Sequence, residues 1–208
     1  MDAIETLMQE HRLIESAIDA LAAYADELRR RQAVGTAEDR AELGRFVAFV
    51  REFADAHHHG KEEDILFAAM VEAGFPRHAG PIAVMLMEHD EGRRQIAVLK
   101  GLVEQQAPWT DLDRARLVEA AGGYAQLLHN HIHKEDAILY PMAEQRLAPA
   151  ALDAVSAACE RYEVEKGASG RPAELAKSAE ALVARHAPAR AACGAGAGPR
   201  FPVSGGCC

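Results

Sequence analysis

The chain has 208 residues, which suits one domain with appendages and is long enough for a sizeable core. Apolar residues make up 49% of the chain and aromatic residues only 5%, a composition that favours helices over strands. The net charge is -9 and no long Lys/Arg patch is present, which argues against nucleic acid as a partner. The sequence has no uncharged apolar run of about 18 residues and no signal-peptide pattern, so we expect no membrane span and a cytoplasmic protein.

Two long helices are expected in the first third of the chain. From residue 3 to about 32, apolar side chains recur with alternating spacings of three and four, the pattern of an amphipathic helix. Gly35 follows this pattern, and Thr36 is suited to cap a second helix from residue 37 to about 72. The stretch AGFPRHAG then ends the second helix.

Two further long helices are expected before residue 148. Pro81 stands at the start of a third helix, a position that tolerates proline, and this helix runs to about 105. Asp111 can cap a fourth helix that continues to about 146, where Pro141 favours a kink. Four helices of this length with short connections predict an all-α, up-down-up-down four-helix bundle over residues 1–148.

The rest of the chain differs in composition. Residues 150–166 and 172–187 predict two short helices within a C-terminal extension at 149–188, which either caps the bundle or forms a homodimer surface. Residues 189–208 are rich in Gly, Ala and Pro and predict a disordered tail. The cysteines are too few and too clustered for a disulfide framework: Cys159, Cys193, Cys207 and Cys208.

An internal repeat relates the second helix to the fourth. Residues 58–67 and 131–140 share the pattern H-x-x-K-E-acid-x-I-L-aromatic. The first and third helices share a shorter pattern, a Glu-His pair that ends at His11 and at His89. A bundle with pseudo-twofold symmetry brings these four segments to one level.

The spacing within the repeat directs one imidazole and one carboxylate of each helix to the same side. His58 and Glu62 are four residues apart, as are His131 and Glu135, and residues at this spacing lie one above the other on a helix face. The same faces otherwise carry apolar side chains, which predicts that they point to the core: Val47, Ala54, Ile65 and Ala69 in one helix, and Leu117, Tyr124, Leu127, Ile138 and Met142 in the other.

Six titratable groups are therefore aimed at the core of the bundle. Burying ionised carboxylates and unpaired imidazoles is costly unless bound metal compensates for their lost hydration. We predict a two-metal site with these ligands: His11, His58, Glu62, His89, His131 and Glu135. The ligand types suit iron, zinc or manganese, with two ions bridged by both carboxylates and a solvent-derived oxo or hydroxo group. A six-coordinate ion with five such ligands keeps one position for a small diatomic molecule or peroxide.

Other polar residues near the repeat are assigned to the surface or to an outer layer around the ligands. The histidines in this set are His57, His59, His129 and His133. His59 has the ligand spacing to Glu63, but its helix face carries Asp55 and resembles a solvated face. Lys61 and Lys134 are interpreted as solvated charges. In the extension, Glu160 or Glu163 is an alternative extra ligand.

The segments LMQEHRLIE, HHGKEEDILF, GPIAVMLMEHDEGR and HIHKEDAILYPM resemble the hemerythrin family, most closely its bacterial hemerythrin-like (HHE cation-binding) branch. The resemblance covers residues 1 to about 146. It implies a four-helix bundle with two non-heme iron ions (Fe) held by the six predicted ligands.

The chain departs from the oxygen-carrying members of that family. Those proteins have a further histidine one turn after the third-helix ligand, where this chain has Arg93, and a longer His-to-Asp spacing where this chain has His131 and Glu135. The resemblance therefore favours the branch with iron–sulfur repair proteins and proteins that handle NO or peroxide. The repair proteins carry paired cysteines in an N-terminal segment, whereas the adjacent pair here, Cys207 and Cys208, lies in the tail and either passes metal or electrons or has no role.

Four functions remain as alternatives on the sequence alone. The first is a non-heme di-iron protein that binds or senses O2, NO or peroxide. The second is an enzyme that disproportionates peroxide or reduces NO at the same site. The third is a protein that stores or donates iron, as in iron–sulfur repair, and the fourth is a metal-free helical interaction module.

Overall fold

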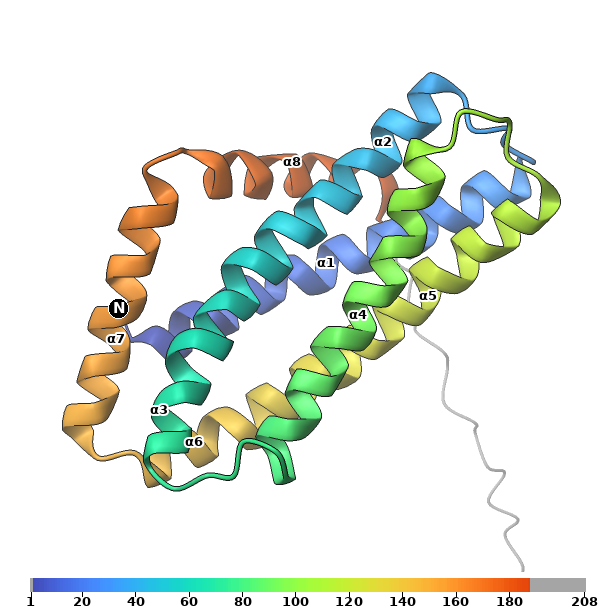
Figure 1. Ribbon diagram of the computed structural model, residues 1–208. Coiled ribbons are helices and arrows are strands. Elements are labelled where there is room, and N and C mark those ends of the chain that lie inside the picture. Colours follow the sequence, from blue (N-terminus) through green and yellow to red (C-terminus); the bar gives the residue numbers. More distant parts are fainter. Residues whose placement is uncertain (1, 188–208) are drawn as a thin grey trace, which may run out of the picture.

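The computed structural model describes residues 2–187, and the predicted tail with Cys193, Cys207 and Cys208 lies outside the described residues. Within this range the chain is helical and has no strand. Four long helical arms form an antiparallel bundle, as the sequence predicts (Figure 1).

The arms have the following bounds. The first is α1 (Ala3–Arg30), and the third is α4 (Gly80–Glu104). The second arm consists of α2 (Ala37–Ala48), η1 (Phe49–His59), η2 (Glu62–Leu66) and α3 (Phe67–Glu72). The fourth consists of α5 (Asp111–Lys134), η3 (Glu135–Leu139) and α6 (Tyr140–Arg146).

The starts of the second and fourth arms are fixed by capping boxes. Thr36 caps α2 as predicted, with its side chain accepting from the Asp39 backbone N–H. The prediction that Asp111 caps α5 is wrong by one residue, because Thr110 is the cap and Asp111 is the first helical residue. The side chain of Asp113 completes this second capping box by accepting from the Thr110 backbone N–H.

The η segments are π-helical, and they lie at the ligand-bearing repeat. Each repeat glutamate, Glu62 or Glu135, is the first residue of such a segment. A π turn inserts about one extra residue into the helical period, so the side chains that follow it change face. Segments of this kind are frequent at functional sites.

This register shift overturns part of the predicted core. Ile138 was expected inside but is 50% exposed, and the next two residues, Leu139 and Tyr140, are buried instead. In the first repeat copy, Leu66 and Phe67 are fully buried while Ile65 lies at the edge of the core. The regular 3.6-residue period cannot predict this change, because it assumes an uninterrupted α-helix.

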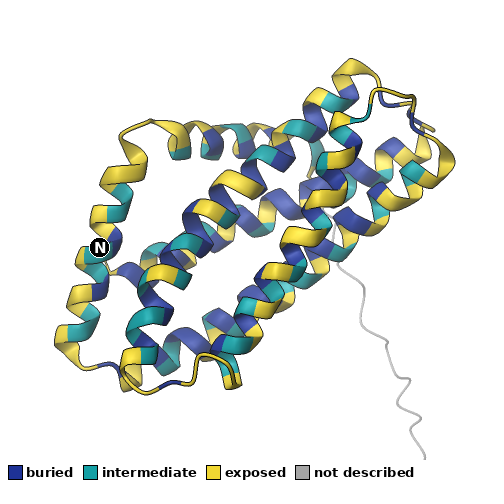
Figure 2. Ribbon diagram, in the orientation of Figure 1, coloured by how far each residue is buried: buried dark blue, intermediate teal, exposed yellow. Residues whose placement is uncertain are grey.

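The core consists of two apolar clusters with a polar layer between them. The larger one fills the end of the bundle where α2 and α5 begin, and the smaller one fills the end formed by α3 and α6. On α1, His11 lies between the apolar residues Leu7 and Ile14, which belong to different clusters. Figure 2 shows that the buried faces of the arms point to the bundle interior.

The extension forms α7 (Pro149–Gly167) and α8 (Arg171–His186), which pack on the bundle (Figure 1). α7 contacts α1 and η2, and α8 contacts α1, α2 and η1. The Tyr162 hydroxyl donates to the Ala56 carbonyl at 2.6 Å, beside Gly60, where an added Cβ would lie only 2.5 Å from that hydroxyl. The separation into a bundle domain and an extension, and a homodimer through the extension, stay predictions.

Among residues 2–187, no helix combines the length and the apolar character needed to cross a lipid bilayer.

Candidate metal centre

The six predicted ligands come together in the polar layer. All six side chains are at most 2% exposed. Their ligand atoms, together with those of His59, form two groups that share Glu62, and we name these groups cluster 1 and cluster 2. Cluster 1 consists of His11, His58, Glu62 and Glu135, and cluster 2 consists of His59, Glu62, His89 and His131.

Glu135 connects the two clusters with one oxygen toward each. Its Oε2 lies 3.3 Å from Nε2 of His11, and its Oε1 lies 3.1 Å from Nε2 of His131. Neither oxygen makes a hydrogen bond. This is the arrangement of a carboxylate that can bridge two cations through two oxygens.

Glu62 belongs to both clusters through a single oxygen. Its Oε2 lies 3.7 Å from Nε2 of His58 and 3.6 Å from Nε2 of His89. Its Oε1 instead accepts a hydrogen bond from the Tyr140 hydroxyl at 2.6 Å. The two carboxylates are therefore not equivalent.

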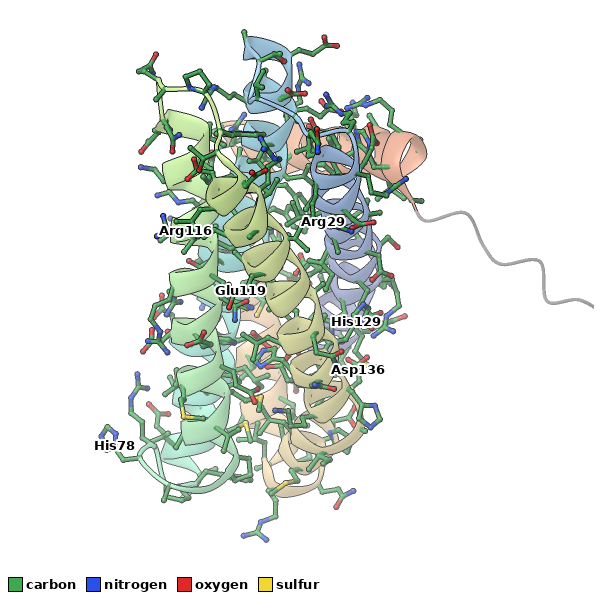
Figure 3. All side chains as sticks on the ribbon, turned by 90° about the vertical axis from the view of Figure 1, so that its right-hand side faces the viewer. Arg29, His78, Arg116, Glu119, His129 and Asp136 are labelled. Atoms are coloured by element: carbon green, nitrogen blue, oxygen red, sulfur yellow. The ribbon has the colours of Figure 1, made fainter. Side chains whose placement is uncertain are left out.

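Every imidazole of the clusters has a carboxylate on its Nδ1, which leaves Nε2 directed inward. The distances are 2.7 Å for His11–Asp136, His58–Glu10 and His89–Glu63, 2.9 Å for His131–Glu88, and 3.4 Å for His59–Asp55. A carboxylate at Nδ1 fixes the ring and its tautomer and makes Nε2 a better metal ligand. Figure 3 shows Asp136 on the side of the fourth arm that faces α1.

The repeat explains how these carboxylates are placed. Glu10, next to one ligand on α1, orients the second-arm ligand His58, and Glu88 on α4 orients His131 in the same way. The repeat lysines pair with these acids, because Lys61 donates to Glu10 and Lys134 donates to Glu88. Each of the four fixed residues in the H-x-x-K-E-acid pattern therefore has a defined role.

The interpretation of Lys61 as a solvated charge is wrong. Its side chain is 1% exposed and donates to Glu10 at 2.5 Å and to Glu163 of α7. Lys134 is partly exposed and has no partner from the extension among its contacts in residues 2–187. The repeat sequence cannot show this difference, because it depends on Glu163 of α7, which lies outside the repeat.

The carboxylates of the clusters favour positive charge next to them, at His11 and His131. Burial and the neighbouring Glu135 raise the pKa of Glu62 well above its usual range. Burial lowers the pKa of His11, but the neighbouring carboxylates of Asp136 and Glu135 outweigh it and raise the value to about 9. Burial likewise opposes charge on His131, while Glu135 raises its pKa to about 10.

The unpaired atoms fit a pair of metal ions. Four buried polar atoms without a hydrogen bond point to the centre of the clusters: Nε2 of His58, Oε2 of Glu62, and both oxygens of Glu135. A buried acceptor without a partner costs about 1–3 kcal/mol, and more when it is charged. Cations between imidazole and carboxylate ligands would satisfy all four atoms, so the residues present fit the predicted site.

His59 is a candidate ligand, although the sequence pattern assigned it to the surface or to the outer layer. It is 4% exposed and stacks on His89, with ring centroids 3.7 Å apart. Asp55, taken as a sign of solvation, is the carboxylate that faces Nδ1 of His59. The sequence signal for this role was Asp55, the acid one turn before His59. The inward position of His59 next to His58 also depends on the π-helical backbone of η1, which the sequence does not show.

The other histidines lie outside the two clusters. His57 contacts Glu163 and Glu10 at 3.1 and 3.6 Å, and these three residues form a third group of ligand atoms, but the Lys61 ammonium already binds both of its carboxylates. Glu163 therefore lies in the outer layer and not at either cluster. His129 pairs with Asp19 of α1 on the surface, and His78 lies at the loop end of the bundle (Figure 3).

Cluster 2 has three imidazoles although Arg93 stands where the oxygen carriers have a further histidine, because His59 of the second arm belongs to it. The Arg93 guanidinium instead bonds the acids that orient two imidazoles, Asp55 at 2.9 Å and Glu63 at 2.7 Å. Arg93 thereby fixes the outer layer around His59 and His89.

A cavity of about 210 Å³ lies between η1, α4 and α5. Its lining includes the imidazoles of cluster 2, His59, His89 and His131. Apolar side chains such as Val50 and Ile96 also line it, and the exposed Arg51 and Arg93 lie at its outer side. The cavity therefore leads from the surface to the imidazoles of cluster 2.

The profile of the hemerythrin HHE cation binding domain matches residues 2–143. This match covers more than half of the chain, and the chain belongs to that family, which confirms the resemblance found in the sequence. The family match and the two clusters together support the binding of non-heme iron.

Curated relatives match a shorter part of the chain. The iron–sulfur cluster repair protein YtfE of Musicola paradisiaca is 40% identical over 91 residues, which is 42% of this chain and 40% of the relative. A probable iron–sulfur cluster repair protein of Haemophilus influenzae is 34% identical over 88 residues, 41% of this chain and 40% of the relative. The iron–sulfur cluster repair protein DnrN of Neisseria gonorrhoeae is 42% identical over 91 residues, 40% of this chain and 54% of the relative. The alignments thus span about half, or less, of the length of these relatives.

Proposed function

We propose that this chain is a non-heme di-iron protein that serves in the repair of iron–sulfur clusters. The observation that carries the proposal is the pair of buried clusters that share Glu62 and are connected by Glu135. The names of the relatives support the repair role, and a protein-bound iron–sulfur cluster is the partner that this role implies. A cytoplasmic location belongs to the same proposal.

In this proposal each cluster would hold one ion. One ion would be held by His11 and His58, and the other by His59, His89 and His131. Glu62 and Glu135 would lie between the ions, and an oxo or hydroxo group is the proposed third bridge. Bound iron would supply a redox-active Lewis acid at this position.

A second candidate function is the binding of O2, NO or peroxide, either for sensing or for turnover. The unequal number of imidazoles favours it: counting both carboxylates and the third bridge, cluster 2 would offer its ion six donors and cluster 1 would offer five. The ion at His11 and His58 would thus keep a position for a small molecule.

Iron transfer tests the repair role. Protein purified without added metal should contain two irons per chain and should restore the cluster of an apo iron–sulfur acceptor under reducing conditions. The variant Glu135→Ala should neither hold nor transfer iron. Iron that stays on the protein while the acceptor remains apo would contradict the repair role and leave the two-ion site intact.

Optical titration separates the second candidate from the first. The iron-loaded protein should show near-ultraviolet bands that change on addition of NO or peroxide, or of O2 after reduction. Sustained oxygen evolution from peroxide would indicate an enzyme, whereas a stoichiometric change would indicate binding or sensing. Bands that none of these molecules alters would exclude both forms of the second candidate.

A further inference from the structure

The Tyr140 hydroxyl reaches the ligand atoms of cluster 1. It donates to Oε1 of Glu62 at 2.6 Å and lies 3.4 Å from Nε2 of His11. The ring stacks on the His11 imidazole with the two planes 4° apart, and the side chain is 1% exposed. Packing and stacking thus hold the hydroxyl in one place.

The repeat provides an internal comparison for this hydroxyl. The residue equivalent to Tyr140 in the first copy is Phe67, which stacks on His89 with planes 16° apart. The two rings occupy equivalent positions against equivalent imidazoles, but Phe67 has no hydroxyl. Accordingly, Glu135 keeps both oxygens without hydrogen bonds, whereas Glu62 keeps only Oε2.

The hydroxyl accounts for the unequal reach of the two carboxylates. Glu135 presents one oxygen to each cluster, at 3.3 and 3.1 Å from the nearest imidazole nitrogens. Glu62 presents the same oxygen to both clusters, at 3.7 and 3.6 Å. Its second oxygen, Oε1, is bound by the Tyr140 hydroxyl, which also lies near Nε2 of His11.

We propose that Tyr140 is a positioning residue that keeps one coordination position of the cluster 1 ion free. It does so by holding Oε1 of Glu62 away from the ion at His11 and His58. The inference rests on the proposed two-ion site and adds the residue that controls access to it. Hydrogen bonds to a buried carboxylate are among the stronger ones, so this contact can compete with a metal for Oε1.

The variant Tyr140→Phe removes the hydroxyl and keeps the ring. The freed Oε1 would then be a buried charged acceptor without a partner, and an ion held by His11 and His58 would be able to satisfy it. The carboxylate would take the free position and exclude other ligands. Because the substitution nearly preserves volume, the fold and both ions should be retained.

Azide titration of the iron-loaded full chain tests the proposal. Azide should bind the wild type, and Tyr140→Phe should lower its affinity by about tenfold or more while two irons per chain remain. The matched control is Tyr24→Phe, another buried tyrosine, whose hydroxyl lies near the Asp39 carbonyl and not at the clusters. This control should bind azide like the wild type.

Infrared spectra provide a second measurement that needs no exogenous ligand. In a zinc-loaded minus metal-free difference spectrum of protein with 13C-labelled glutamate, the wild type should show one carboxylate bound through one oxygen and another bound through two. Tyr140→Phe should lose the one-oxygen bands. Unchanged azide affinity, unchanged carboxylate bands, or a di-iron wild type that binds no azide would each overturn the proposal. Failure of the wild type to bind two ions would instead overturn the proposed function and this inference with it.

Discussion

The first half of the bundle, residues 2–72, and the second half, residues 80–146, hold their imidazoles in the same way. In both halves a lysine binds a glutamate, and that glutamate orients the ligand on the neighbouring arm. In both halves the acid after the repeat glutamate orients a ligand on α1 or α4.

The halves differ at three places around this shared arrangement. The first half contributes His59 where the second has Ile132, and the second contributes Tyr140 where the first has Phe67. The extension covers the first half, where Glu163 reaches Lys61. In the proposed two-ion site, the shared residues would hold both ions, and the departures at His59 and Tyr140 would make the surroundings of the two ions unequal.

The largest expected effect comes from the carboxylate that joins the clusters. Glu135→Ala removes the oxygens that face His11 and His131, and we expect both ions to be lost, with metal affinity at least about 100-fold lower. Glu119→Ala, an exposed acid on the same arm, is the control (Figure 3). Chelator competition with elemental analysis measures the change. Two ions retained in Glu135→Ala would show that Glu135 is no bridge.

Removing the additional imidazole tests the first departure. His59→Ala should leave cluster 1 loaded and reduce the metal content from two ions per chain to one. Free imidazole should restore the second ion, because the cavity of about 210 Å³ leads to this position. His129→Ala, on the surface beside Asp19, should retain both ions. Two ions per chain in His59→Ala would mean that His89 and His131 are the only imidazoles cluster 2 needs, as the sequence predicts.

Substitutions of the two repeat lysines test whether the extension makes the ion pair of the first half more stabilising than that of the second. Lys61→Met leaves the partly buried Glu10 without its ammonium partner and should lower the free energy of unfolding by about 3 kcal/mol. Lys134→Met removes a partly exposed pair with Glu88, and about 1 kcal/mol or less is expected. Urea unfolding of the metal-free proteins measures both. Equal losses would contradict the difference in burial.

The smallest effect concerns the attachment of α8 to the first half through Glu42. Burial raises the pKa of Glu42, but hydrogen bonds from His186, Arg185 and Arg45 outweigh it and lower the value from 4.5 to about 2. The charged carboxylate is thus the stabilising form, so its contribution is complete above pH 4.5 and is lost as the pH falls toward about 2.

Unfolding of Glu42→Gln at two pH values checks this sign. At pH 7 the variant should be less stable than the wild type by roughly 1 kcal/mol, since its partners Arg185 and Arg45 are half exposed. Near pH 2 most of the difference should be gone, because about half of the wild-type carboxyl is then protonated in the folded protein. A difference that is the same at both pH values would mean that Glu42 acts through packing and not through charge.

The sequence was sufficient for features that depend on local spacing. Periodicity and breaks predicted the four arms, and the spacing from His58 to Glu62 predicted ligands that the structure brings together. The sequence was insufficient where the backbone departs from the α-helix. The π-helical segments moved Ile138 outward and brought His59 inward, and neither change is visible in a 3.6-residue period. The burial of Lys61 depends on α7, a contact between residues 102 positions apart.

Anomalous diffraction from crystals of the iron-loaded full chain tests the two-ion site most directly. Data collected at the iron edge should show two peaks about 3.5 Å apart, one between His11 and His58 and the other among His59, His89 and His131. A single peak, no peak in this layer, or ligand nitrogens turned away from the peaks would contradict the account.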